Sequence, residues 1–198
     1  TSPAEGEGKT FVAANLANAF ADLGRKTILI DGDTRRGDLH HILERDRKPG
    51  LTDFLMNGKS HQIVQNTDNP RLHFVGFGSK TSSSPELLTS PQMGSFLAGL
   101  KRRYEVIIID SPPMAAGSDA YILGAHAGSV LTVLRSGTTN KDMAAAQMES
   151  FLRLPVRLLG AVLNDFTPQL GQGYYRYYSH YLPGYEASEE KEEEVGVV

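Results

Sequence analysis

The chain has 198 residues, enough for one domain with a hydrophobic core and a tail. It contains no cysteine and no apolar run near the ~20 residues of a membrane span, so disulfides, zinc–thiolate sites, thiol nucleophiles and spanning helices find no support. The net charge of −3 combines −5 on residues 186–194 with +2 on residues 1–185, which excludes the broad basic field of a nucleic-acid-binding protein.

Residues 1–10 form a glycine-rich turn that runs into an apolar pattern of helical spacing over residues 11–20. A turn that ends in Gly-Lys-Thr at the start of a helix is typical of a phosphate-binding loop, because backbone N–H groups and the helix N-terminus surround the phosphate oxygens. Lys9 can reach the terminal phosphates, and Thr10 can bind Mg²⁺. Pro3 stands where the general pattern has its first glycine, so a plain glycine-rich helix start is the alternative.

A helix over Lys9–Leu23 is predicted to end at Gly24 and to be followed by a buried strand at Thr27–Asp31. Helix, short turn and buried strand are half of a β-α-β unit. We therefore expect a further strand directly before Thr1, which this chain lacks, and regard the chain as an N-terminally truncated domain.

Two aspartates lie at the end of the first predicted strand. Asp31 and Asp33 are two residues apart, so both side chains point to the same side in extended backbone. Ligands of open α/β sheets bind beyond the carboxyl ends of the strands. Solvated turn aspartates are the alternative, but beside a phosphate loop the two carboxylates, with Arg35 and Arg36, predict a metal- and phosphate-handling edge.

The rest of the chain to residue 165 alternates helices with strands. We expect strands at 72–75, 106–110, 130–134 and 158–163 and helices at 91–104, 118–124 and 140–154. This order predicts an α/β fold of the P-loop NTPase type, with three layers around a mainly parallel sheet.

The predicted strand at 106–110 has four β-branched residues followed by Asp110. A carboxylate at such a strand end faces the phosphate loop in nucleoside-triphosphate sites and holds Mg²⁺, often through water. A buried strand ending in aspartate is common, so this feature gains its meaning from the Gly-Lys-Thr turn upstream.

The end of the chain is rich in tyrosine and glutamate. Six of the eight tyrosines lie close together: Tyr174, Tyr175, Tyr177, Tyr178, Tyr181 and Tyr185. An aromatic low-complexity tail and a stacking platform for single-stranded nucleic acid are alternatives, but the second lacks a basic groove. A tyrosine-rich tail attached to a nucleotide site suggests that the tyrosines accept phosphate. We expect a P-loop domain at 1–170 and a flexible tail at 171–198.

Taken together, these motifs resemble the bacterial tyrosine kinases of capsule and exopolysaccharide biosynthesis over residues 1–185. Residues 2–10 resemble the Walker A loop of that family, where proline in place of the first glycine is usual. Residues 28–36 resemble its Walker A′ motif and residues 106–113 its Walker B motif, and the tyrosine cluster is its terminal hallmark. Gly37 departs from the proline common in the family, and the family's ring-forming upstream helix is not in this chain.

The resemblance implies an autophosphorylating protein-tyrosine kinase that uses ATP and Mg²⁺. Lys9 would neutralise charge on the transferred phosphoryl group, and Asp31 would orient or deprotonate the tyrosine hydroxyl. Asn164 resembles the adenine-contacting residue of related ATPases. The catalytic set is Lys9, Asp31, Asp33 and Asp110; the metal set is Thr10, Asp33 and Asp110; the nucleotide-binding set is Gly6, Glu7, Gly8, Lys9, Thr10, Phe11 and Asn164.

The partners implied are other copies of the chain and a membrane component. Tyr174 lies only ten residues past Asn164, so we expect phosphorylation in trans, in a ring-like homo-oligomer of the full protein. The resemblance also implies a membrane polysaccharide co-polymerase segment or partner at the cytoplasmic face of the bacterial inner membrane, with this fragment itself soluble. No nucleic-acid partner is expected.

Two other functions remain open at this point. A partitioning or positioning ATPase of the same fold would usually carry an extra lysine early in the loop, where this chain has Ala4. A non-catalytic nucleotide-binding regulator of polysaccharide chain length would show the same motifs.

Overall fold

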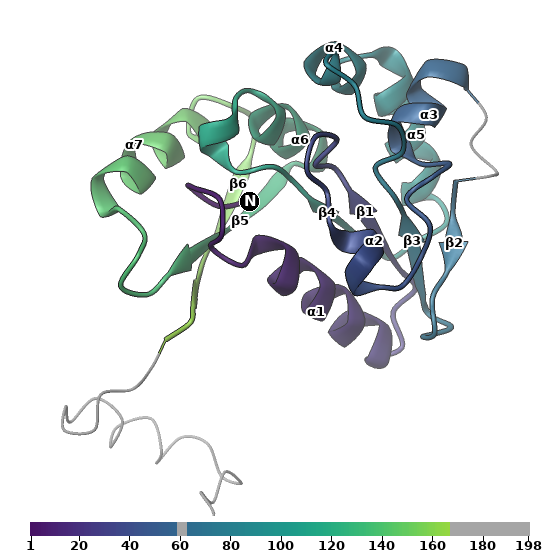
Figure 1. The fold of residues 1–198 in the computed structure, drawn as a ribbon, viewed down its shortest axis with the longest axis horizontal. Coiled ribbons are helices and arrows are strands. Elements are labelled where there is room, and N and C mark those ends of the chain that lie inside the picture. The colour runs from purple at the N-terminus through teal and green to yellow at the C-terminus, as the bar shows by residue number, and fades with distance from the viewer. Residues whose placement is uncertain (59–62, 167–198) are drawn as a thin grey trace, which may run out of the picture. The chain divides into compact units, whose positions relative to one another are not determined.

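The computed structural model describes residues 1–58 and 63–166. Its helices are α1 (Lys9–Asp22), α2 (Leu39–Ile42), α3 (Leu51–Asn57), α4 (Ser84–Leu88), α5 (Pro91–Lys101), α6 (Asp119–Ala127) and α7 (Lys141–Phe151). Its strands are β1 (Thr27–Asp31), β2 (Gln65–Asn66), β3 (Leu72–Val75), β4 (Val106–Asp110), β5 (Ser129–Arg135) and β6 (Arg157–Asn164). Figure 1 shows their arrangement.

Strand β1 lies in the middle of a four-stranded sheet with the order β2-β3-β1-β4. Both neighbours of β1 are parallel to it, and the short β2 is antiparallel to β3. All five residues of β1 are buried, as expected for a continuous apolar run covered on both faces. The prediction of a mainly parallel α/β fold is confirmed.

The side chains of β1 alternate between two hydrophobic clusters. Ile28 and Ile30 pack in one cluster with residues of α3, α4, α5 and α6. Leu29 points to the other face and packs with α1 and α2. The period of two along the strand therefore produces helices on both faces of the sheet, which is the predicted three-layer arrangement.

The predicted helix boundaries are close to those observed. Helix α1 ends one residue short of the prediction, and Gly24 follows it with a positive φ of 83°, a conformation that glycine adopts without steric cost. The helix predicted over 91–104 ends at Lys101, and Tyr104 is buried against the core cluster of α5 instead.

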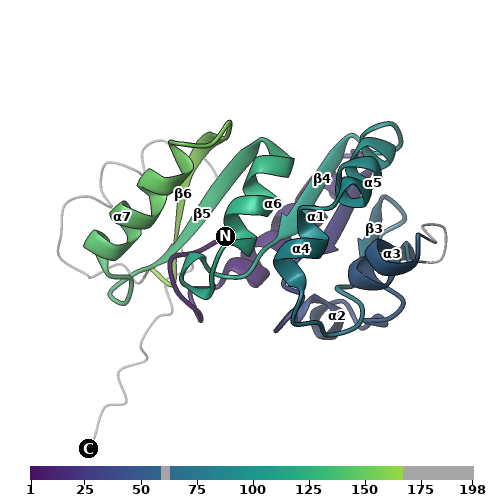
Figure 2. The same cartoon turned by 90° about the horizontal axis from the view of Figure 1, so that it is seen from above.

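Strands β5 and β6 pair in parallel with each other as a separate two-stranded sheet. Figure 2 shows this pair beside α7 and α6. Phe151 of α7 is fully buried and packs with Val130 of β5 in a third cluster.

A cavity of about 300 Å³ lies between β4 and β5, with α1 residues also lining it. At its edge the Thr1 nitrogen donates to the Leu131 carbonyl at 3.1 Å, and the Val133 nitrogen donates to the Thr1 carbonyl at 2.9 Å. These two bonds are those of a residue at the end of a strand parallel to β5. Thr1 therefore pairs with β5 at the point where the chain enters the phosphate loop.

Residues 1–165 form one compact unit. The predicted boundary between residues 170 and 171 lies outside the described residues, as do the six clustered tyrosines. Within the described ranges, no helix has the length and apolar character needed to cross a membrane.

Candidate active site

The phosphate-loop segment leads directly into α1. Gly6 and Gly8 have positive φ values of 79° and 90°, so the backbone between them follows a path that other residues rarely adopt. Gly8 is the N-cap of α1, and the helix begins at Lys9. The Lys9 ammonium lies 3.3 Å from the Thr10 hydroxyl. A loop of this kind at a helix N-terminus presents backbone N–H groups to an anion.

The two acidic strand ends meet beside this loop. Asp31 and Asp110 are directly opposite each other in the β1–β4 ladder, and both are buried. Burial raises the pKa of Asp31 well above its usual range, and the neighbouring Asp110 raises this pKa further. Two buried carboxylates side by side are costly to ionise together, and a bound cation would offset that cost.

The phosphate loop supplies part of the positive charge. Burial raises the pKa of Asp110, while the Lys9 ammonium and the Thr10 hydroxyl act in the opposite direction. Lys9 and Thr10 are therefore close enough to stabilise the ionised Asp110. The structure thus brings together Lys9, Thr10, Asp31 and Asp110 from three separate segments.

Asp33 is held in the turn that follows β1. Its Oδ1 accepts hydrogen bonds from the backbone nitrogens of Arg35 at 3.2 Å and Arg36 at 2.9 Å. The backbone nitrogen of Asp33 in turn donates to Asp31 Oδ1 at 3.2 Å. These bonds fix the two carboxylates of the Asp-x-Asp motif relative to each other.

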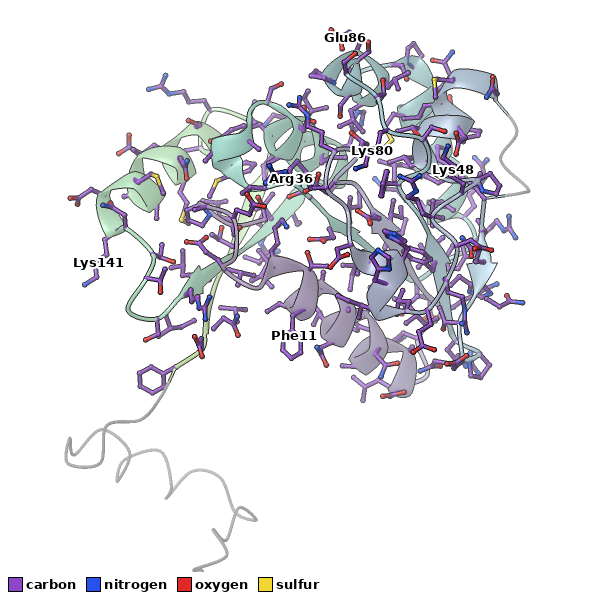
Figure 3. The ribbon with its side chains drawn as sticks, in the orientation of Figure 1. Phe11, Arg36, Lys48, Lys80, Glu86 and Lys141 are labelled. Atoms are coloured by element: carbon purple, nitrogen blue, oxygen red, sulfur yellow. The ribbon has the colours of Figure 1, made fainter. Side chains whose placement is uncertain are left out.

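The two arginines of this turn pair with acidic side chains. Arg36 Nη1 donates to both carboxylate oxygens of Glu5 in the phosphate loop, at 2.6 and 2.7 Å. Figure 3 labels Arg36. Arg35 lies 3.6 Å from the buried Asp119 of α6. The Glu5–Arg36 pair therefore links the phosphate loop to the turn after β1.

The two strand-end carboxylates each have an oxygen without a protein partner. Among the described residues, Oδ2 of Asp31 and Oδ2 of Asp110 are buried without a hydrogen-bond partner. The Asp110 oxygen is a hard ligand of the kind that suits Mg²⁺, whereas the Asp31 oxygen is left to accept a proton. No three acidic or histidine side chains within the described ranges form a complete metal cluster, so phosphate oxygens, Thr10 or water would have to supply the remaining ligands.

Asn164 and Phe11 occupy different positions around the loop. Asn164, at the end of β6, donates from Nδ2 to the Glu7 carbonyl at 3.1 Å. Phe11 is 62 % exposed and projects from α1 (Figure 3). The predicted nucleotide-binding roles of both residues stay predictions.

Sequence reasoning missed two residues that hold the loop. Arg135 Nη1 donates to the Gly6 carbonyl at 3.2 Å, and Thr139 Oγ1 donates to Glu7 Oε1 at 2.6 Å. Glu7 Oε2 accepts from the Ala4 nitrogen at 3.0 Å. Both residues follow the loop by about 130 positions and belong to no motif, so only the folded chain brings them to it.

A second feature that was not predicted from the sequence is a side-chain hydrogen-bond network at the turn after β1. Thr34 Oγ1 donates to Ser84 Oγ at 2.7 Å, and Ser84 Oγ donates to Asp119 Oδ2 at 2.7 Å. All three side chains are buried. This network ties the turn to α4 and α6.

Gly37 explains how the turn accommodates Asp31. A Cβ atom on Gly37 would lie 2.4 Å from both carboxylate oxygens of Asp31, which is closer than atoms can approach. The glycine therefore leaves the space that the Asp31 carboxylate occupies.

Comparison with known proteins places this chain in a family. The model of the CobQ/CobB/MinD/ParA nucleotide-binding domain matches residues 1–184. Tyrosine-protein kinase YwqD of Bacillus subtilis is 36% identical over 178 residues, covering 88% of this chain and 75% of that protein. The chain belongs to the bacterial tyrosine-kinase family.

Solved structures agree with this family. The kinase domain of the Escherichia coli tyrosine kinase ETK superposes with a TM-score of 0.82 at 28% identity, covering 88% of this chain and 69% of that one. The VpsO kinase domain superposes with a TM-score of 0.79 at 32% identity, covering 84% and 83%. MinD of Pyrococcus horikoshii, at 21% identity and a TM-score of 0.70, shares the fold.

Several relatives are much longer than this chain. Tyrosine-protein kinase ptk of Acinetobacter johnsonii is 32% identical over 167 residues, which are 83% of this chain but 23% of that protein. The chain thus spans about a quarter of the length of relatives of this size.

Proposed function

We propose that this family member is an ATP-dependent protein-tyrosine kinase domain that transfers the γ-phosphoryl group of ATP to tyrosine hydroxyls. One observation carries the proposal: Asp31 and Asp110 face each other at the end of two parallel strands, beside Lys9 and Thr10. The names of the relatives, which are tyrosine kinases, support the same activity.

In this scheme the residues mainly align groups and stabilise charge, as phosphoryl transfer requires. The loop N–H groups and Lys9 hold the terminal phosphates, and Thr10, Asp33 and Asp110 hold Mg²⁺. When bound, the Mg²⁺ neutralises charge on the phosphate oxygens.

Asp31 acts on the acceptor. The tyrosine oxygen forms a bond to the γ-phosphorus while the bond from that phosphorus to the ADP oxygen breaks, and the hydroxyl proton passes to Asp31. Because a tyrosine hydroxyl has a pKa near ~10, the carboxylate acts late, as the new bond forms. ADP and phosphotyrosine are the products.

The acceptors in this proposal are the tail tyrosines of another copy. Six phosphotyrosines would add roughly −9 to −12 charge beside a tail that already carries −5 on residues 186–194. Repulsion between tails would then separate the copies, giving an assembly cycle. We place this cycle in capsular or exopolysaccharide synthesis and export, with a membrane co-polymerase segment or partner at the cytoplasmic face of the inner membrane.

The activity is tested by incubating the chain with γ-labelled Mg–ATP and detecting both phosphotyrosine and free phosphate. A kinase labels its own tyrosines. Release of phosphate without labelled tyrosine would instead favour a switch ATPase, and neither product would favour a non-catalytic regulator.

Transfer between copies is tested by mixing a Lys9→Ala chain that keeps its tail with an active chain whose tail is deleted after residue 170. Phosphotyrosine on the Lys9→Ala chain supports the trans reaction, and its absence, with the active chain still labelling itself when its tail is present, contradicts it. Measuring the oligomer size of phosphorylated and dephosphorylated samples then tests whether phosphorylation separates the copies.

A further inference from the structure

The carbonyl groups of the phosphate loop are held by two side chains from the β5–β6 pair. Arg135, the last residue of β5, reaches the Gly6 carbonyl at 3.2 Å. Asn164, the last residue of β6, reaches the Glu7 carbonyl at 3.1 Å. The two strand ends are register partners in the parallel ladder, so their side chains arrive at consecutive peptide groups of the loop.

A carbonyl held in this way determines where the next N–H group points. The C=O of one residue and the N–H of the next belong to a single planar trans peptide, and they point in opposite directions. With the Gly6 and Glu7 carbonyls directed toward β5 and β6, the N–H groups of Glu7 and Gly8 are directed away from them. Within the described residues, neither of these N–H groups donates a hydrogen bond.

Both side chains are themselves fixed. The guanidinium of Arg135 is paired with Asp165, from Nε at 2.9 Å and Nη2 at 2.8 Å. The amide of Asn164 is in close contact with Gly8, where a Cβ would lie 2.0 Å from Nδ2. Gly8 therefore has to be glycine for two reasons: its positive φ and the amide against it.

We propose that Arg135 and Asn164 are positioning residues of the phosphate site. They hydrogen-bond to the carbonyl oxygens of two consecutive peptide groups, so that the N–H groups of Glu7 and Gly8 face the phosphates of the nucleotide. In this assignment Asn164 acts on the phosphate end of the nucleotide through the loop. The inference rests on the proposed nucleotide site and is independent of tyrosine phosphorylation.

The test compares three ligands that share a chain of three phosphates: Mg–ATP and Mg–GTP, which differ in their base, and Mg–tripolyphosphate, which has none. Binding to the full 198-residue chain is measured by calorimetry for the natural chain and for Asn164→Asp and Arg135→Gln. Asn164→Asp keeps the side-chain shape but replaces the donor by an oxygen facing the Glu7 carbonyl. Arg135→Gln shortens the side chain and removes its charge.

The expected result is an equal loss of affinity for all three ligands, roughly tenfold for each variant, since each loses one hydrogen bond that orders the loop. Arg135→Lys, which keeps one donor, should recover part of the loss. Arg157→Gln, an exposed change at the start of β6, serves as the matched control and should leave binding unchanged. Thermal unfolding of every variant separates loop effects from loss of the fold.

Two results would overturn the proposal. One is unchanged tripolyphosphate binding together with an altered preference between ATP and GTP in Asn164→Asp, which would make Asn164 a base-contacting residue. The other is natural affinity for all three ligands in both variants. A chain that binds the three ligands but labels no tyrosine would refute the kinase proposal and leave this one standing, whereas a natural chain that binds none of them would refute both.

Discussion

The two sheets of this protein contrast in how well their strands are covered. Every residue of β1 in the four-stranded sheet is buried. In β6 of the two-stranded sheet, more than half of the residues are exposed and none is fully buried. The difference follows from the neighbouring elements. Strand β1 has a hydrogen-bonded strand on each side and helices on both faces, whereas within the described part of the chain β6 pairs only with β5.

The two sheets also contribute different parts of the site. The four-stranded sheet carries the acidic groups Asp31 and Asp110 at its carboxyl edge. The two-stranded sheet carries Arg135 and Asn164, which donate hydrogen bonds to carbonyl groups of the phosphate loop. We therefore expect changes in the first sheet to affect the chemical step and the fold, and changes in the second to affect the holding of phosphate.

The largest effect is expected from Asp31→Asn. The substitution removes the proton acceptor and should lower the rate of tyrosine phosphorylation by about 10²- to 10⁴-fold, while Mg–ATP affinity changes by only a few-fold. Single-turnover labelling and calorimetry measure the two quantities. Asp142→Asn on the exposed start of α7 removes the same charge elsewhere and should leave both unchanged. A variant that keeps more than a tenth of the rate would contradict the role given to Asp31.

The second effect compares one leucine from each sheet. Leu29 of β1 is fully buried and Leu163 of β6 is 54 % exposed. Leu29→Ala should lower the free energy of unfolding by about 2–5 kcal/mol through lost burial and a cavity, whereas Leu163→Ala should cost less than ~1 kcal/mol. Urea unfolding of both variants measures this. Equal losses would mean that the second sheet is as well packed as the first.

A third, smaller effect is expected from Gly37→Ala. The new Cβ would push against the Asp31 carboxylate and displace it, so we expect the phosphorylation rate to fall by about tenfold, as misplacement by a fraction of an ångström does in aligned sites. Gly99→Ala is the control, because a Cβ there meets no atom within 4 Å and Gly99 lies inside α5. That control should keep full activity and gain up to ~1 kcal/mol of stability. An active Gly37→Ala chain would show that Asp31 can move without loss.

The smallest effect concerns pH. Burial lowers the pKa of His73 on β3 below 6.5, and the nearby Lys26 and Arg103 lower it further. The unfolded chain therefore binds this proton more readily than the folded chain, and stability is lost as the pH falls through 6.5 toward the folded-state pKa. Between pH 7.5 and pH 5, the natural chain should lose up to about 3 °C more in melting temperature than His73→Gln. An equal loss of melting temperature in the natural chain and in His73→Gln between the two pH values would contradict this.

Much of the four-stranded sheet could be predicted from local sequence. Each run is a short, mostly apolar stretch that ends in an aspartate, at Thr27–Asp31 and Val106–Asp110, so both strands and their acidic ends were correctly identified. Gly24 marked the end of α1 for a similarly local reason, because glycine readily adopts the positive φ that is observed there. Both acidic ends were expected beside the phosphate loop because ligand groups collect at the carboxyl edge of a parallel sheet, but their register was not.

The two-stranded sheet and its contacts were less predictable. The strands were found, but nothing in the residues around Arg135 or Thr139 indicates a contact with a loop some 130 positions earlier. The buried Thr34–Ser84–Asp119 network was likewise invisible, since each of its members is an ordinary polar residue in its own segment. Contacts of this kind depend on how elements pack, which local pattern does not specify.

The amino-acid sequence alone determined the phosphate loop, the two acidic strand ends and the order of helices and strands, because each depends on residue type and spacing over a few positions. The tertiary structure alone decided that Asp31 and Asp110 lie opposite each other in raised-pKa positions, that Gly37 makes room for the first of them, and that β5 and β6 hold the back of the loop. Burial, register and side-chain reach are properties of the packed chain, and they set the charge and the direction of the groups that face the nucleotide.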